Sequence, residues 1–175
     1  HRSDVVLGTT VDRVIQEAEC DVLVETFTEE GRPRAAETIL VPTAAGPHTD
    51  LAVKVAGALA RQHGGSVRLL NVVDPDLPLT ERREIEAALE EKAGALGGVE
   101  HEIALVDSED VVESIVAETG RHDLTVMGAT REGLLQQLLL GAVPESVAER
   151  TRSPLIMVKS YMGVVSRLKR WFRWR

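Results

Sequence analysis

Short apolar runs alternate with longer stretches of helical periodicity through most of the chain. Four runs are predicted to be buried strands, because each is brief, rich in Val, Leu and Ile, and followed by a turn signal. They cover residues 38–42, 67–73, 124–127 and 155–158. A fifth segment, residues 99–105, alternates apolar and charged positions, which is typical of an edge strand.

Between these strands, apolar residues recur at three- and four-residue spacing, which predicts amphipathic helices. One helix is predicted over residues 51–61, a second is expected to be capped by Thr80, a third to start at Ser108 and a fourth at Gly141. The second helix has an apolar face formed by Ile85, Ala88, Leu89, Ala93 and Leu96. Strands that alternate with helices predict an α/β fold with a parallel, doubly wound sheet.

The first part of the chain repeats the last helix and strand of this pattern. Shifted by 133 positions, Gly8 falls on Gly141 and residues 22–24 fall on residues 155–157. This similarity predicts an internal repeat whose first copy is reduced to its last helix and strand. Chance similarity of two amphipathic helices, each followed by a strand, is the alternative. We therefore divide the chain into residues 1–26 (end of the first repeat), 27–37 (polar linker), 38–160 (complete domain) and 161–175 (tail).

The composition is that of a globular protein with a sizeable core. Of its 175 residues, 43% are apolar and 27% are charged, and the single Cys20 excludes a disulfide framework. The sequence has neither a signal-peptide pattern nor an apolar run long enough to cross a bilayer. Because the first residue is His1 rather than Met, we expect the chain to be part of a longer protein.

Charge is distributed unevenly along the chain. The formal net charge is −8, yet residues 159–175 hold six basic residues and no acidic ones, which leaves −14 on residues 1–158. An acidic body argues against a nucleic-acid partner, since phosphate neutralisation needs a basic surface.

The most informative motif lies in residues 123–143. Gly128 closes an apolar run, and Gly141 follows 13 positions later at the start of a predicted helix. A strand, a loop with glycine and a helix N-terminus together form an arrangement that cradles phosphate through backbone N–H groups. Two ordinary turn glycines are the alternative, because glycine is the usual residue at tight bends.

The amino-acid sequence of this segment resembles the signature of the universal stress protein family. That signature is G-x-x-G, followed by nine residues and then G-S/T. Gly128 and Gly141 match the first and last glycines, whereas Arg131 replaces the middle glycine and Ala142 replaces the Ser or Thr. The flanking runs, residues 126–128, 138–141 and 153–158, also match. The resemblance implies a Rossmann-like, five-stranded parallel sheet of order 3-2-1-4-5, to which the partial repeat adds a helix and an edge strand.

The resemblance also implies a site for an adenine nucleotide at the ends of the first and fourth strands of the complete domain. Its implied contact residues are Thr43, Ala44, Val72, Gly128, Arg131, Gly141, Ala142 and Val143. Ala44 stands where the family's binders have Asp, so with Arg131 and Ala142 three ligand-contacting positions depart from the pattern. We therefore expect no cofactor, or weakly bound ATP or AMP. Arg131 could pair with a phosphate, fill the pocket with its own charge, or be solvated.

Enzyme chemistry finds little support in the sequence. The histidines are scattered without the spacing of a metal site, and Ser146 and Ser153 lack a nucleophile-elbow context. We therefore expect no catalytic residues and no metal. Three hypotheses remain: a regulatory module that responds to an adenine nucleotide, a stand-alone stress-response protein or dimerisation scaffold without a ligand, and an ATP-using enzyme. We favour the first.

The segments GATREGLL and TAAGPH are similar to stress-protein domains at the cytoplasmic ends of membrane transporters, particularly archaeal amino-acid permeases. This resemblance implies a covalently attached transporter and a cytoplasmic, membrane-tethered location. Residues 164–175 predict a basic amphipathic helix with Trp that suits an anionic membrane surface. Packing of Trp171 and Trp174 on the acidic body or on a partner subunit is the alternative.

A homodimer through the fifth strand is a further expectation, because family members commonly join there. An apolar strand at a sheet edge is an aggregation hazard if it stays bare. Residues 22–24 are therefore expected to pair antiparallel with residues 155–158, either in the same chain or in a second copy.

Overall fold

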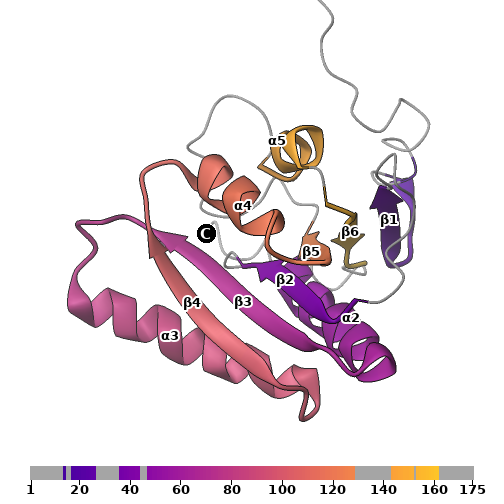
Figure 1. The fold of residues 1–175 in the computed structure, drawn as a ribbon, viewed down its shortest axis with the longest axis horizontal. Coiled ribbons are helices and arrows are strands. Elements are labelled where there is room, and N and C mark those ends of the chain that lie inside the picture. Colours follow the sequence, from indigo (N-terminus) through magenta and orange to yellow (C-terminus); the bar gives the residue numbers. More distant parts are fainter. Residues whose placement is uncertain are drawn as a thin grey trace, which may run out of the picture.

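The computed structural model describes residues 14, 17–26, 36–43, 47–128, 143–151 and 153–161. Within these residues the chain forms a six-stranded sheet with helices on both faces (Figure 1). The elements are, in chain order, β1 (Val22–Thr26), β2 (Thr38–Pro42), α2 (Pro47–His63), β3 (Ser66–Val73), α3 (Leu79–Ala93), the 3-10 turn η1 (Gly94–Leu96), β4 (His101–Asp107), α4 (Val111–Thr119), β5 (Leu124–Gly128), α5 (Val143–Arg150) and β6 (Leu155–Lys159).

The strands stand in the order β1-β6-β5-β2-β3-β4. Strands β2 to β6 run parallel to their neighbours, whereas β1 is antiparallel to β6. Counted from β2, the parallel strands have the expected order 3-2-1-4-5, and β4 is an edge strand as predicted. The expected α/β, doubly wound fold is confirmed. The sheet as a whole is mixed because β1 adds to the outer side of β6.

The predicted pairing of residues 22–24 with residues 155–158 is also confirmed. Val24 lies opposite Met157, and Leu23 lies opposite Val158. Both strands belong to the same chain. The edge of β6 that was expected to receive this strand or a second copy is therefore occupied by β1 in cis.

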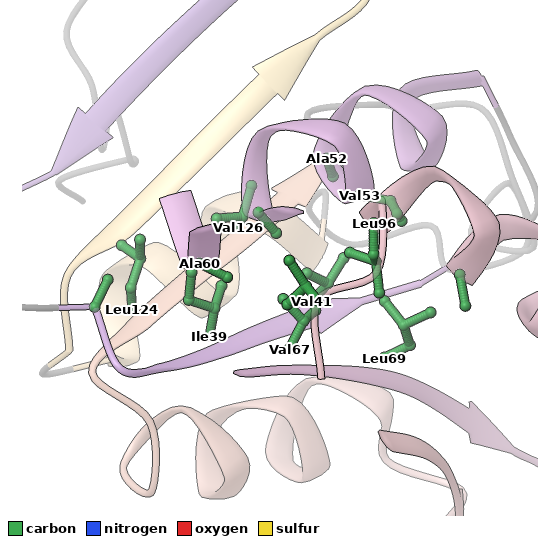
Figure 2. Packing of buried hydrophobic residues seen from close by; sticks show 14 of the residues in the cluster. Ile39, Val41, Ala52, Val53, Ala60, Val67, Leu69, Leu96, Leu124 and Val126 are labelled. Carbon is green, nitrogen blue, oxygen red and sulfur yellow. The ribbon is translucent and has the colours of Figure 1, made fainter. Parts of the chain in front are cut away.

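One core lies between the sheet and α2, where successive side chains of β2 alternate between the two faces. Ile39 and Val41 belong to this core. On α2, Ala52, Ala56 and Ala60 recur every four residues and are 0% exposed, so small side chains let the helix lie close to the sheet. Figure 2 shows this packing, to which the other strands and η1 contribute Val67, Leu69, Leu96, Leu124 and Val126.

A second core lies on the opposite face, beneath α4 and α5. It consists of Leu40, Leu70, Ala104, Ile115, Met127, Val143, Val147, Leu155 and Met157. Full burial of one such aliphatic side chain stabilises the fold by about 1.5–3 kcal/mol. Because both faces of the central strands are covered, these strands read as continuous apolar runs in the sequence.

The predicted cap of α3 and the predicted start of α4 are wrong. The residue before α3 is Pro78, which has φ −55° and makes no side-chain cap hydrogen bond, and Thr80 lies inside the first turn. The cap of α4 is Asp110, whose side chain accepts a hydrogen bond from the Glu113 N–H at 2.9 Å. Ser108 lies further out, where its Oγ accepts from the Asp110 N–H at 3.1 Å. Before α3, a proline with fixed φ occupies the cap position in place of the predicted hydroxyl group. Before α4, a carboxylate nearer to the helix does so.

Several predicted boundaries shift as well. Helix α2 begins at Pro47 rather than Leu51 and ends at His63. Strand β4 begins at His101, two residues after Val99. On α3, Leu89 and Ala93 are buried as expected, whereas Ala88 is exposed. The predicted helix over residues 164–175 lies outside the described residues.

Candidate functional site

The candidate site lies at the carboxyl ends of β2 and β5. These strands are neighbours, with Ile39 opposite Leu124 and Leu40 opposite Thr125. From β2 the chain continues to β3 on one side, and it returns through α4 to β5 on the other side (Figure 1). Such a change of direction is where ligands bind in open α/β sheets, because the two connecting loops separate there.

Thr43, the residue after β2, is held against β3 by all of its polar groups. Its N–H donates to Leu70 O at 2.7 Å, and its Oγ1 donates to the same oxygen at 2.9 Å. The Asn71 amide Nδ2 in turn donates to Thr43 O at 3.1 Å and to Thr43 Oγ1 at 3.3 Å. Since its hydroxyl proton is already donated, Thr43 anchors the β2 end and has no donor left for a ligand.

Asn71 is a functional candidate that was not singled out from the sequence. It is 9% exposed and lies near the end of β3, where it fixes the start of the loop after β2. A signal was available, because a lone amide interrupts an otherwise apolar run there. A buried amide needs hydrogen-bond partners, so its position implied a polar neighbour on the adjoining strand.

The other described site residues lie around the same edge of the sheet. Gly128 is the last residue of β5 and lies opposite Val158. Val72 packs on the second core, and Val143 at the start of α5 is 4% exposed within that core. The side chain of Val143 is therefore a packing group, and its backbone is the part that could face a ligand. Ala44, Arg131, Gly141 and Ala142 lie outside the described residues.

Carboxylates surround the carboxyl ends of β3 and β4. Asp74 Oδ1 accepts from the Asp76 N–H at 2.8 Å, and Asp107 pairs with Arg82. The Ser108 N–H donates to Val73 O at 3.0 Å, which ties the loops after the two strands together. Asp74 and Asp76 add negative charge after β3, whereas Arg82 offsets the charge of Asp107.

Two histidines in the described part of the chain lie within hydrogen-bonding distance of backbone carbonyl groups. The Nδ1 of His101 lies 3.1 Å from Val99 O, and the Nδ1 of His122 lies 2.8 Å from Glu118 O. Among the described residues, no group of three His, Cys, Asp or Glu is arranged to hold a metal ion. Nor does any helix within those ranges have the length and apolar character needed to span a membrane.

The doubly wound sheet, with helices on both faces, defines a domain of the Rossmann-like α/β class. The universal stress protein family matches residues 36–159 of the chain. The chain therefore belongs to this family. None of the curated proteins is significantly similar to it in sequence.

Solved structures show the same fold. A universal stress protein in complex with cAMP is 25% identical, with a TM-score of 0.58 over 73% of this chain and 99% of its own. The universal stress protein from Archaeoglobus fulgidus in complex with dAMP is 17% identical, with a TM-score of 0.57 over 71% of this chain and 98% of its own.

Another universal stress protein from Archaeoglobus fulgidus covers more of the chain. It is 19% identical with a TM-score of 0.60, and the match spans 87% of this chain but 54% of that protein. This chain thus corresponds to about half of the larger relative. At this level of identity, the likeness shows the fold alone.

Proposed function

We propose that the chain is a non-catalytic regulatory module whose adenine-nucleotide site is degenerate. The observation that carries the proposal is the anchoring of Thr43, which commits the polar groups of an expected contact residue to Leu70 and Asn71. Two structures of similar fold hold cAMP and dAMP, which supports an adenine nucleotide as the ligand class. The negative charge of Asp74 and Asp76 after β3 weakens the attraction for a polyphosphate.

Two departures from the family's pattern support the same conclusion. Ala142 has no hydroxyl group to donate to a phosphate, and Ala44 has no carboxylate to hold a nucleoside. Loss of one hydrogen bond to a charged group costs about 1.5–3 kcal/mol. Two such losses weaken binding roughly a hundredfold or more, because each 1.4 kcal/mol is a factor of ten.

Calorimetric titration with ATP, ADP and AMP tests this proposal. We expect weak or undetectable binding by the wild-type chain, and a gain of roughly a hundredfold in the triple variant Ala44→Asp, Arg131→Gly, Ala142→Ser. Arg131→Lys is the matched control, because it keeps a long cationic side chain and should gain nothing. Low-micromolar binding of ATP by the wild type would contradict the degenerate site.

A scaffold without any ligand is the second candidate. The hydrogen bonds and ion pairs at the carboxyl ends of the strands favour it. There the polar groups of Thr43 are satisfied within the protein, and Asp107 is paired with Arg82. The triple variant distinguishes the two functions. If restored side chains recover nucleotide binding, the site is a degenerate nucleotide site; if they do not, the edge serves as a scaffold only.

We infer that the module is fused to the cytoplasmic end of an amino-acid transporter. This inference rests on the sequence similarity of residues 128–135 and 43–48 to stress-protein domains of such transporters. The basic segment 164–175 would then lie close to an anionic membrane surface. An antibody against this chain should detect a much larger polypeptide in the membrane fraction of the source cells. Detection of a soluble polypeptide of this chain's size alone would contradict the attachment.

A further inference from the structure

The sheet has two outer strands, β1 and β4 (Figure 1). Strand β1 covers the edge of β6, whereas no strand pairs with the outer side of β4 within the described part of the chain. The β4 edge is also the longer of the two, with seven residues against five. Since an unpaired strand edge is a template for pairing, a further strand can add to the sheet at β4.

Alternate residues of β4 point their backbone groups away from β3. The Val67 N–H donates to Glu100 O at 2.9 Å. At the other end of the ladder, the Ser108 N–H donates to Val73 O at 3.0 Å. Because the register between the strands is continuous, the even-numbered residues of this segment bond to β3, and the odd-numbered ones face outward. The open edge therefore consists of the N–H and C=O groups of His101, Ile103, Leu105 and Asp107.

The features that usually protect a strand edge are weak on β4. Residues 103–106, Ile-Ala-Leu-Val, contain neither a charged residue nor a proline. The two carboxylates of the strand are held by cations of the same chain. Glu102 pairs with Arg68 of β3 at 2.8 Å, and Asp107 pairs with Arg82 of α3. Four apolar residues thus remain on which another strand can pair without meeting an uncompensated charge.

The sequence of β4 is chemically symmetric about Ala104. If the strand pairs antiparallel with a second copy of itself about this residue, Ile103 lies opposite Leu105 of that copy. His101 then lies opposite Asp107, and this pairing of a basic with an acidic residue occurs twice. Both members of each pair lie on the same face of the sheet, because their positions differ by an even number. Opposed apolar pairs and opposed unlike charges both stabilise neighbouring strands.

We propose that the outer side of β4 is an interface at which a second copy of the chain pairs antiparallel, with Ala104 on the two-fold axis. The outward-facing groups of Ile103 would exchange N–H to O=C hydrogen bonds with those of Leu105 in the other copy. Such an interface is isologous, so two copies use up this edge completely. The complementarity of His101 with Asp107 is what favours a second copy over an unrelated strand. The interface lies on the side of the sheet away from β1 and β6.

Cross-linking in the full chain tests this register. Cys20→Ser removes the single cysteine, and Ala104→Cys then places one thiol of each copy directly opposite the other. Oxidation is expected to give a covalent dimer. In the control, Cys20→Ser with Val106→Cys, the two thiols lie on the same face but about 13 Å apart along the strands, and they should stay free. Equal cross-linking of the two variants, whether high or absent, would overturn the proposal.

A proline at position 103 separates loss of the interface from loss of the fold. Ile103→Pro removes an N–H that faces outward, so the hydrogen bonds between β3 and β4 are kept. The dimer would lose one hydrogen bond in each half, and sedimentation equilibrium should show roughly tenfold weaker association. Ile103→Val is the matched control, because it keeps the N–H and should associate like the wild type. A dimer that is insensitive to Ile103→Pro would place the interface elsewhere and overturn the proposal.

Exchange of charge between the copies tests the choice of partner. His101→Asp places two carboxylates opposite each other, and Asp107→Lys places two basic side chains opposite each other. Each variant alone should therefore be mainly monomeric, with an unchanged circular dichroism spectrum. An equimolar mixture should dimerise again, because each introduced side chain then faces an opposite charge. A mixture that associates no better than its components would overturn the proposal. So would a wild-type chain that stays monomeric at every concentration, which would leave the edge to an extended strand of another protein.

Discussion

At the scale of single residues, two buried threonines have opposite hydrogen-bonding states. Thr125 on β5 is 0% exposed, and its Oγ1 has no partner within the described residues. Thr119 at the end of α4 is 1% exposed, and its Oγ1 donates to Val116 O at 2.7 Å and accepts from Thr151 Oγ1 at 2.8 Å. A buried hydroxyl costs free energy unless hydrogen bonds compensate for lost water.

This contrast gives the first prediction on stability. Thr125→Val replaces an uncompensated hydroxyl by a methyl group, so the free energy of unfolding should stay unchanged or rise by up to about 1 kcal/mol. Thr119→Val, the matched control, should lower it by about 1–3 kcal/mol, because Thr151 and Val116 O lose their partner. Urea denaturation measures both changes. A Thr125 variant that is less stable than the Thr119 variant would show that the Thr125 hydroxyl is paired.

The ends of β2 and β5, where the candidate site is expected, could be predicted from single residues, but the hydrogen bonds of the side chains there could not. Gly128 marks the end of β5 because an apolar run stops there. Thr43 was expected to contact a ligand, yet its hydroxyl bonds to Leu70, 27 positions away in sequence. That contact depends on the register between β2 and β3, which local sequence does not encode. The sequence shows Asn71 as a polar residue in an apolar run, but its hydrogen-bond partner could not be inferred from the sequence.

At the scale of elements, the order of strands and helices follows from periodicity, whereas their ends depend on competing local groups. The apolar runs correctly predicted the strands β2, β3, β5 and β6. The starts of α3 and α4 were mispredicted because Pro78 and Asp110 stand beside hydroxyl residues that also cap helices. The backbone geometry decides which of these neighbouring residues caps the helix. The boundaries of helices and strands are therefore less predictable than their presence.

The turn between α2 and β3 gives a prediction at this scale. A Cβ on Gly65 would meet the backbone oxygens Glu37 O at 2.5 Å and Ala36 O at 2.6 Å. Gly65→Ala must therefore push β3 away from the entry to β2, and we expect the free energy of unfolding to fall by about 1–3 kcal/mol. Thermal unfolding measured by circular dichroism would record this change.

Gly94 is the matched control for Gly65. Its backbone is helical, with φ −54°, and a Cβ there would have no neighbour within 4 Å. Gly94→Ala should therefore leave stability unchanged or raise it by about 0.5–1 kcal/mol, since alanine restricts the unfolded chain. Equal effects at the two positions would show that close backbone approach is not what requires glycine at Gly65.

At the scale of the whole molecule, the topology was predictable because few arrangements satisfy the rules for parallel sheets. Right-handed crossovers and two covered faces leave little freedom once five strands alternate with helices. The pairing of β1 with β6 followed from a different rule, the cost of a bare apolar edge. Pairing within one chain was not predictable, because a strand of a second copy satisfies the same rule.

Charge is the other property of the whole molecule with a testable consequence. Residues 1–158 carry a net charge of −14, while residues 159–175 carry six positive charges and no negative ones. The body should be repelled by an anionic membrane, and the tail should be attracted by about 1 kcal/mol for each Lys or Arg near the surface. We therefore expect the full chain to sediment with anionic vesicles at low salt, and a chain shortened to end at Lys159 to remain in solution.

Salt and lipid composition provide the controls for this prediction. High salt should release the full chain, because it screens the attraction between tail and lipid. Neutral vesicles should bind neither chain. Equally poor binding of both chains to anionic vesicles would exclude the membrane role. In that case a lower melting temperature of the shortened chain would show that the tail packs on the acidic body, where its arginines offset part of the negative charge.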